Sequence, residues 1–156
     1  MSPEHNEPMN IELRACDGSE EMPETPSEFE DWGDRDPAAQ PLGLERWLVL
    51  VDGEVVGMVS AHPNWYGPTS GSMAMNIGIA LIPEQRGKGI GGQAQRTLAR
   101  MLHARGIHRV EASTDVLNIA EQRALEKAGF SVEGVARGAQ VRADGRHDLQ
   151  VWSHLA

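Results

Sequence analysis

The sequence predicts an α/β domain of the α+β type, in which helices flank a mixed β-sheet. Two apolar runs flank Asp52-Gly53, a dipeptide that favours a two-residue turn with positive φ and hence a β-hairpin. Between residues 73 and 130, strand patterns alternate with helical patterns. A second hairpin, around Asp144-Gly145, closes the chain. Hairpins and crossovers together predict both antiparallel and parallel strand pairs.

The first elements follow in order along the chain. Met9 to Ala15 alternates apolar and polar residues with period two, which is typical of a half-buried strand. Residues 17–41 are acidic and rich in proline, so any helix there should be short, for example around residues 27–32. The first hairpin should join strands at residues 46–51 and 55–59.

The second half alternates strands with helices. Residues 73–82 form an apolar run that Pro83 ends, as expected for a buried strand. Apolar residues of 92–105 fall on one helical face, and Gly106 is well placed as a C-terminal cap. The remaining elements are a strand at 107–114, a helix at 118–128 that Gly129 ends, and hairpin strands at 130–141 and 149–155.

Length and composition limit what the chain can be. With 156 residues, 40% of them hydrophobic, it should form a single domain over residues 1–156, with residues 1–8 disordered. A nucleic-acid binder would usually be basic, so the net charge of −9 argues against that class. We see no membrane-spanning run and no secretory signal. The single cysteine, Cys16, favours a reducing compartment and thus the cytoplasm.

A glycine-rich turn follows the strand at 73–82 and opens the next helix. Its residues are Arg86, Gly87, Lys88, Gly89, Ile90 and Gly91. Glycines let the backbone turn tightly and approach a ligand, and the first N–H groups of a helix have no partner within that helix. Because the helix dipole is positive at this end, the turn suits a phosphate or pyrophosphate. The Arg86 and Lys88 side chains would add positive charge.

Three classes of phosphate-binding protein use turns of this kind. A P-loop nucleotidase needs Ser or Thr after Gly-Lys, but Gly89 follows Lys88. Residues 87–92 do match the Rossmann pattern G-x-G-x-x-G, and Glu111 lies about where a ribose-binding acid belongs. However, the turn follows an antiparallel hairpin instead of opening a βαβ repeat. A Rossmann-type dinucleotide-binding protein therefore remains an alternative only.

The third class is the GNAT superfamily of acyltransferases, which the sequence resembles over residues 77–152. Arg86-x-x-Gly89-x-Gly91 resembles the family's pyrophosphate loop, (Gln/Arg)-x-x-Gly-x-(Gly/Ala). The similarity continues through Asn118, Arg123 to Phe130, Glu133-Gly134 and Gly145-Arg146-x-Asp148. This pattern is similar to the branch that contains the ribosomal-protein N-terminal acetyltransferases. It implies six to seven strands, mostly antiparallel, with a central splayed parallel pair and about four flanking helices.

The resemblance implies acetyl-CoA as cosubstrate and no metal. Residues 73–130 would form the CoA-binding core, with the diphosphate on the loop 86–91. Asn118 would hydrogen-bond the pantetheine arm, or simply cap its helix. The arm would pair with the backbone of Ile79, Ala80 and Leu81, where one N–H would polarise the thioester carbonyl. The acceptor amine would attack this carbonyl directly.

A base is needed because the acceptor amine is mostly protonated at neutral pH. Glu111 is the first candidate, since it occupies a strand position that matches the general-base glutamate of some family members. Alternatively, it is a surface carboxylate or forms a salt bridge with Arg109. His62 and His147 are further candidates. On the preceding strand, Asn76 replaces a common glutamate of the family; it cannot take a proton, but it could position the acceptor.

The family's proton donors for the leaving thiolate are also replaced. Leu125 stands where a tyrosine is common, and Glu121 stands where the ribosomal-protein branch has a serine. A water or Tyr66, the only tyrosine, would then serve as donor.

Residues 17–44 should form the acceptor side of the site. Their acidic side chains would attract a cation, unless they are simply solvated. Trp32, Trp65 and Tyr66 are candidates to line the acceptor pocket.

Together these features predict an N-acetyltransferase acting on a primary amine of a small, cationic molecule or of a peptide N-terminus. A non-catalytic acyl-CoA sensor is the alternative, because the tyrosine and the strand glutamate are absent. Many members of the family are dimers, so a homodimer is possible; we expect neither a nucleic-acid nor a membrane partner.

Overall fold

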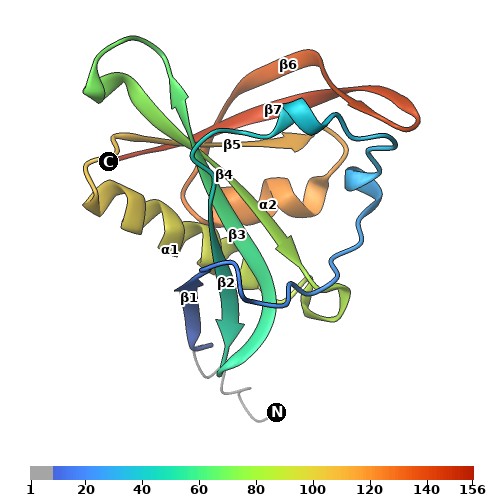
Figure 1. Ribbon diagram of the computed structural model, residues 1–156, viewed down its shortest axis with the longest axis vertical. Coiled ribbons are helices and arrows are strands. Elements are labelled where there is room, and N and C mark those ends of the chain that lie inside the picture. The colour runs from blue at the N-terminus through green and yellow to red at the C-terminus, as the bar shows by residue number, and fades with distance from the viewer. Residues whose placement is uncertain (1–8) are drawn as a thin grey trace, which may run out of the picture.

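A single seven-stranded sheet runs through the computed structural model, which describes residues 9–156, in the order β1-β2-β3-β4-β5-β7-β6 (Figure 1). The strands are β1 (Ile11–Ala15), β2 (Glu45–Val51), β3 (Glu54–Trp65), β4 (Met73–Leu81), β5 (Arg109–Asp115), β6 (Ser131–Arg142) and β7 (Gly145–Leu155). All neighbouring strands are antiparallel except β4 and β5, which are parallel. The predicted mixed sheet is thereby confirmed, whereas the predicted disorder of residues 1–8 lies outside the described residues.

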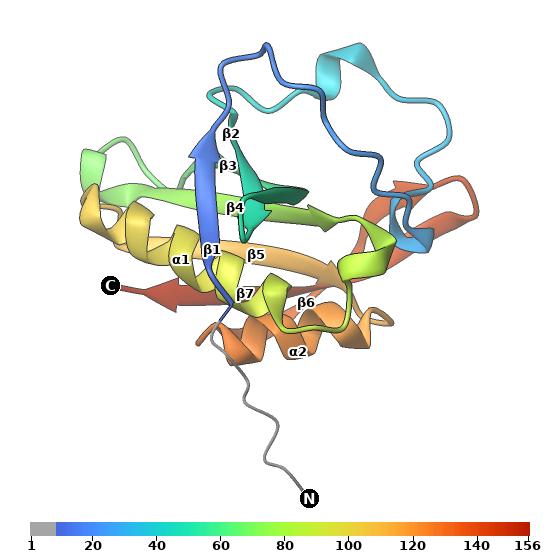
Figure 2. The same ribbon diagram turned by 90° about the horizontal axis from the view of Figure 1, so that it is seen from below.

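Two α-helices, α1 (Ile90–Ala104) and α2 (Ile119–Lys127), cover one face of the sheet (Figure 2). The prediction of about four flanking helices is therefore wrong. The other helical turns of the described residues are single 3₁₀ turns at Glu28–Glu30, Pro37–Ala39, Ser70–Ser72 and Pro83–Gln85. None of these turns contains a buried residue, and short helices without a packed apolar face are marginal in water.

The core lies between α1 and the middle of the sheet. Leu98 and Leu102 of α1 are fully buried, as are Val59 of β3 and Val110 of β5. Burial of each such side chain contributes about 1.5–3 kcal/mol. This packing holds α1 against the middle of the sheet, and residues 82–89 connect it to the end of β4.

The first predicted hairpin is confirmed. Asp52 and Gly53 have φ angles of 50° and 83°, and the flanking residues Val51 and Glu54 pair across the turn. Two consecutive positive φ angles are what a tight hairpin turn requires, and they explain the Asp-Gly dipeptide.

The two parallel strands separate halfway along their length. They pair only from Met75↔Val110 to Ile77↔Ala112. Beyond that point β4 stays paired with β3 as far as Leu81, and β5 stays paired with β7 as far as Asp115. A wedge therefore opens between residues 78–81 and residues 113–115.

Residues 16–44 connect β1 to β2 along the face of the sheet opposite to the two helices (Figure 2). The Phe29 carbonyl accepts a hydrogen bond from Arg142 at 2.8 Å, and the Asp31 carbonyl accepts one from the Ala143 N–H, also at 2.8 Å. These contacts attach the segment to the hairpin of β6 and β7. Neither α-helix of residues 9–156 is long and apolar enough to cross a membrane.

Candidate functional site

The glycine-rich loop lies at the wide end of the wedge, beyond the end of β4. Gly87 and Gly89 have φ angles of 75° and 82°, a left-handed conformation that glycine adopts without strain. Gly89 is the N-cap of α1 and gives no side-chain hydrogen bond to the helix. The first amides of α1 are therefore left without a capping side chain and lie beside an exposed turn.

The unpaired edge of β4 leads to this loop. Ile79, Ala80 and Leu81 are half-buried, and their backbone faces the wedge on the side away from β3. A Cβ on Gly91 would lie 3.7 Å from Ala124 Cβ and 3.8 Å from Ile79 Cδ1. The two helices and β4 thus meet directly behind the loop. An open strand edge that ends on free helix amides fits an extended ligand with a diphosphate, as in acetyl-CoA.

The two cationic side chains of the loop differ in what they contact. Arg86 donates to the Leu81 carbonyl from Nε at 3.2 Å and from Nη2 at 3.0 Å, and Nη2 also donates to the Pro26 carbonyl at 2.6 Å. It therefore ties the end of β4 to the 16–44 segment. Lys88 is exposed and contacts only Gln85 Oε1, at 3.5 Å, so its ammonium is available to an anion.

Asn118 caps α2 at the end of the neighbouring strand. Its Oδ1 accepts a hydrogen bond from the Glu121 N–H at 3.2 Å. The cap uses only the oxygen, so the Nδ2 group remains a donor on the β5 side of the wedge.

Glu111 lies where the two parallel strands are still paired, directly beside Asn76. Its buried carboxylate accepts hydrogen bonds from Asn64 Nδ2 at 2.5 Å, Tyr66 Oη at 2.7 Å and Arg109 Nε at 2.9 Å. Burial alone raises the pKa of Glu111, but the three hydrogen bonds outweigh it, and the net pKa lies below the ordinary value. The carboxylate is therefore ionised and firmly oriented at neutral pH.

Arg109 extends this cluster to the surface. Its Nη1 and Nη2 groups donate to the two oxygens of Glu133, both at 2.7 Å, and Ser153 Oγ also donates to Glu133 at 2.7 Å. These hydrogen bonds, led by those from Arg109, lower the pKa of Glu133 to about 2. An open hollow of about 400 Å³ lies here, lined by Tyr66, Arg109, Glu133 and Val151.

The salt bridge between Glu111 and Arg109, expected as an alternative to the base role, is present, because residues two apart on a strand share a face. Sequence reasoning missed the remaining partners. Asn64 and Glu133 come from strands far apart in the chain, so no local pattern indicated them.

The three predicted acceptor residues do not come together. Trp65 and Tyr66 follow one another at the end of β3 and are 56% and 64% exposed. The Tyr66 ring faces the Arg109 guanidinium, 5.6 Å away, at the start of β5. Trp32 belongs to the 16–44 segment. Its neighbour Asp31 binds Ala143 in the β6–β7 turn, which lies beyond the opposite end of β5.

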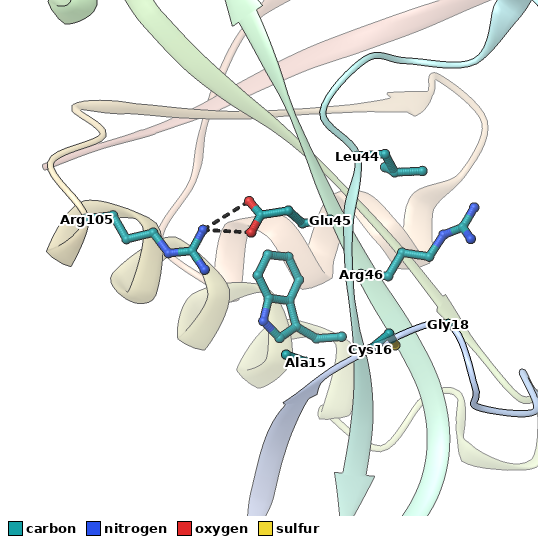
Figure 3. Close-up of a pocket in the computed structure, with 8 residues that line it drawn as sticks. Ala15, Cys16, Gly18, Leu44, Glu45, Arg46 and Arg105 are labelled. Atoms are coloured by element: carbon teal, nitrogen blue, oxygen red, sulfur yellow. Dashed lines mark hydrogen bonds and ion pairs between the residues drawn. The ribbon is translucent and has the colours of Figure 1, made fainter.

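A second hollow, of about 340 Å³, lies away from the wedge, between the start of β2 and the end of α1 (Figure 3). Arg105 donates to both oxygens of Glu45 at 3.0 Å and covers the Trp47 ring at 5.6 Å. Cys16 lines this hollow, and burial, followed by the charge of Glu20, raises the pKa of its thiol. A thiol with a raised pKa is a poor nucleophile at neutral pH.

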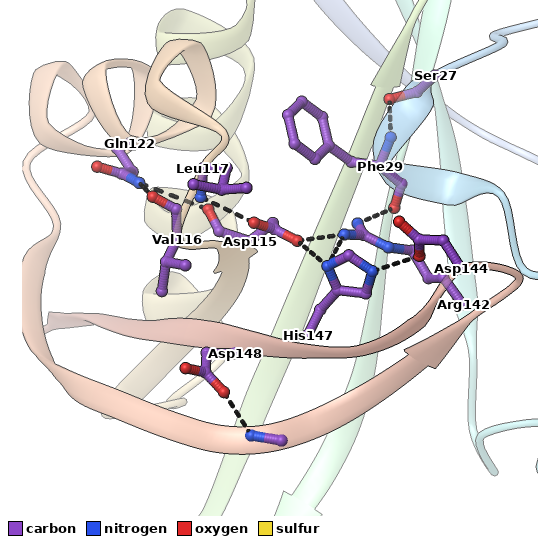
Figure 4. A network of polar contacts seen from close by, with 11 residues as sticks. Ser27, Phe29, Asp115, Val116, Leu117, Gln122, Arg142, Asp144, His147 and Asp148 are labelled. Carbon is purple, nitrogen blue, oxygen red and sulfur yellow. Dashed lines mark hydrogen bonds and ion pairs between the residues drawn. The ribbon is translucent and has the colours of Figure 1, made fainter.

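A buried polar network lies at the far end of β5 (Figure 4). Arg142 forms an ion pair with Asp115, and both side chains are almost fully buried. The His147 ring lies between two carboxylates: its Nδ1 is 3.2 Å from Asp115 Oδ2, and its Nε2 is 2.5 Å from Asp144 Oδ1. This base candidate therefore takes part in the anchor of the 16–44 segment. The other, His62, contacts the Pro63 carbonyl at 3.3 Å.

Within the part of the chain that the structure describes, no group of His, Cys, Asp or Glu side chains is placed to hold a metal ion.

Comparisons with known proteins identify the family. Residues 6–130 match the model of the acetyltransferase (GNAT) family. YjcK of Bacillus subtilis (strain 168), a probable N-acetyltransferase, is 42% identical over 62 residues, which are 39% of this chain and 34% of that protein.

Among the solved structures that are similar in fold are two acetyltransferases. The crystal structure of a probable acetyltransferase is 30% identical with a TM-score of 0.62, over 73% of this chain and 63% of that chain. RimL, a ribosomal-protein alpha-N-acetyltransferase in complex with coenzyme A, is 25% identical with a TM-score of 0.63, over 72% of this chain and 62% of that chain. This chain thus spans about a third of the curated relative and less than two thirds of these structures. Because the family model matches most of its length, the chain belongs to the acetyltransferase (GNAT) family.

Proposed function

We propose that this protein transfers the acetyl group of acetyl-CoA to a primary amine. One observation carries the proposal: the wedge between β4 and β5 ends on the glycine-rich start of α1, whose first amides lack a capping side chain. Membership of the family supports it, as do the probable N-acetyltransferase YjcK and the coenzyme A complex of RimL.

The loop and the strand edge would bind different parts of the cosubstrate. The free amides of residues 87–91 and the Lys88 ammonium would hold the diphosphate. The backbone of residues 79–81 would pair with the pantetheine arm as an added strand, with Asn118 Nδ2 as a further donor. A backbone N–H on this edge would polarise the thioester carbonyl and stabilise the oxyanion.

Glu111 is our proposed base, acting with Asn76 as a positioning group. The two residues lie side by side in the paired part of the strands, just before the wedge opens. A lowered pKa makes Glu111 a weak base, so much of the rate would come from orienting the amine beside the thioester. Titration of Glu111 itself should affect turnover only in acid, below the ordinary range of a glutamate, because its pKa is lowered.

The acceptor would be a cationic amine, either a small molecule or a peptide N-terminus. The 16–44 segment lies over the strand face that carries Asp115, because Arg142 binds both Phe29 and Asp115, and Glu111 shares that face. The segment exposes Glu28, Asp31, Asp34 and Asp36. These carboxylates would raise the local concentration of a cation. Trp32 would contact the acceptor on this side of the site. Trp65 and Tyr66 would contact it at the hollow beside Arg109. A homodimer in the cytoplasm remains our prediction.

Release of free CoA thiol, measured against a panel of amines, tests the proposal. The panel should contain peptides with free and blocked N-termini, polyamines and amino acids. A transferase releases CoA only with acceptors that have a free amine and forms the N-acetyl product. If acetyl-CoA binds but no amine causes release of CoA, the non-catalytic sensor is favoured. Leu125, which stands at the family's tyrosine position, is fully buried and apolar and is also compatible with a sensor.

A further inference from the structure

A second glutamate lies at the wedge, on the helix side of the sheet. Glu121 is in the first turn of α2, three residues before Ala124 and therefore on the same helical face. That face meets α1 at Gly91 and β4 at Ile79, because a Cβ on Gly91 would lie within 4 Å of both Ala124 and Ile79. The face of α2 that carries Glu121 thus lies where α1, α2 and the unpaired edge of β4 converge.

Helix capping does not explain this glutamate. Asn118 and Glu121 have the spacing of a capping box, in which the glutamate would accept a hydrogen bond from the N-cap backbone N–H. The Asn118 N–H donates instead to the Asp115 carbonyl at 2.9 Å. Only the Asn118 side chain contributes, through its 3.2 Å bond with the Glu121 N–H. The Glu121 carboxyl is therefore not used by the cap.

No cation holds the Glu121 carboxyl either. None of the ion pairs among residues 9–156 includes Glu121, whereas Glu111 and Asp115 each pair with an arginine. Burial raises the pKa of Glu121 to about 7, and a contact with the Gln95 amide offsets only part of this effect. No charged group of α1, β4 or β5 contributes to the shift. Gln95 itself donates to the Gly91 carbonyl at 3.2 Å.

Tyr66, the other side chain considered as proton donor, is already engaged. Tyr66 donates to the Glu111 carboxylate at 2.7 Å, and this hydrogen bond, followed by burial, raises the pKa of Tyr66. Its proton is therefore held more tightly than that of an ordinary tyrosine.

We propose that the Glu121 carboxyl donates the proton to the CoA sulfur as the thiolate leaves, an inference that rests on the proposed acetyl transfer. The C–S bond of the tetrahedral intermediate breaks, the sulfur keeps the electron pair, and the Glu121 proton passes to the sulfur. The surplus proton of the amine nitrogen leaves through Glu111 to solvent, and Glu121 regains a proton from solvent. A thiol has a pKa of about 8.5, so a carboxyl that titrates near neutrality can protonate a thiolate downhill.

Glu121→Gln keeps the size of the side chain and removes the acidic proton. We expect kcat to fall by about 100-fold, with little change in the KM for acetyl-CoA. The loss of wild-type kcat as pH rises through about 7 should vanish in the variant. Glu126→Gln, on an exposed position of the same helix, is the matched control and should leave the rate and the pH profile unchanged. Wild-type kcat and an unaltered pH profile in Glu121→Gln would overturn the proposal.

The thiolate absorbance of bound CoA tests the contact without turnover. An ionised Glu121 beside the sulfur disfavours a second negative charge, so the bound thiol should titrate at higher pH in the wild-type protein than in Glu121→Gln. Equal thiol titrations in a protein that does acetylate amines would contradict the role of Glu121 alone. CoA binding with different titrations, but without acetylation of any amine, would contradict the proposed function.

Discussion

Single arginines organise the polar residues at both ends of β5. Arg109 holds Glu111 and Glu133 at the start of the strand, and Arg142 holds Asp115 at its end. Glu111 and Asp115 are four residues apart on one strand and so share a face. The strand thereby carries an oriented carboxylate at each end, one at the closed end of the wedge and one beneath the 16–44 segment.

The buried ion pair of Arg142 should be necessary for stability. Arg142→Ala leaves the Asp115 carboxylate buried without its cation, so we expect the free energy of unfolding to fall by about 3–5 kcal/mol. Urea unfolding followed by circular dichroism measures this loss. Arg137→Ala, on an exposed position of β6, should change it by less than about 0.5 kcal/mol. An equally small loss for Arg142→Ala would show that the network is not structural.

Glu133 should make stability depend on pH in the acid range. Its pKa is about 2 in the folded protein and near 4.5 in the unfolded chain, so its contribution is complete above about pH 4.5 and is lost as the pH falls toward 2. Solvent screening limits this contribution to about 1 kcal/mol. Urea unfolding of Glu133→Gln should show a deficit at pH 6 that is much smaller at pH 2.5. A deficit that does not change between these values would contradict the assignment.

At the scale of elements, the wedge depends on how closely β3 holds β4. Gly57 of β3 pairs with Leu81 at the end of β4, where a Cβ would lie 2.2 Å from the Ala80 carbonyl oxygen. Only glycine permits this approach. Because β4 remains attached to β3 while it separates from β5, its other edge stays free for a ligand.

Gly57→Ala should therefore disturb both the fold and the site. The added methyl group must push the two strands apart, so we expect a loss of more than about 2 kcal/mol in the free energy of unfolding and weaker acetyl-CoA binding. Gly71→Ala is the control, since a Cβ there meets no atom within 4 Å and the backbone is not left-handed. Equal stability of the two variants, measured by urea unfolding, would show that the close approach is not needed.

The elements that could be predicted from the sequence are those that a short run of neighbouring residues determines. Asp52-Gly53 defines its hairpin through φ angles alone, so the turn was predictable. Helix number was overestimated, because it was taken from the resemblance, whereas the segment that would supply further helices is proline-rich and has no apolar face. The partners of Glu111 come from β3 and β5, and the Asn64 contact depends on the order of strands in the sheet, which no local pattern specifies.

At the scale of the whole molecule, two surfaces meet at the wedge. One is the helix layer, with the free amides of α1, Lys88 and Glu121; the other is the opposite face, with Glu111 and the acidic 16–44 segment. Arg86 connects them, since it binds the carbonyls of both Leu81 and Pro26. An anionic cosubstrate and a cationic acceptor would thus approach the same thioester from different sides of the sheet.

Isothermal titration calorimetry of the purified protein tests the central claim most directly. We expect acetyl-CoA to bind, NADH to give no measurable heat, and Lys88→Ala to weaken acetyl-CoA about tenfold, or about 1.4 kcal/mol. Arg100→Ala, on an exposed position of α1 away from the loop, should bind acetyl-CoA like the wild-type protein. Tight binding of NADH, with no uptake of CoA or its thioesters, would contradict the account.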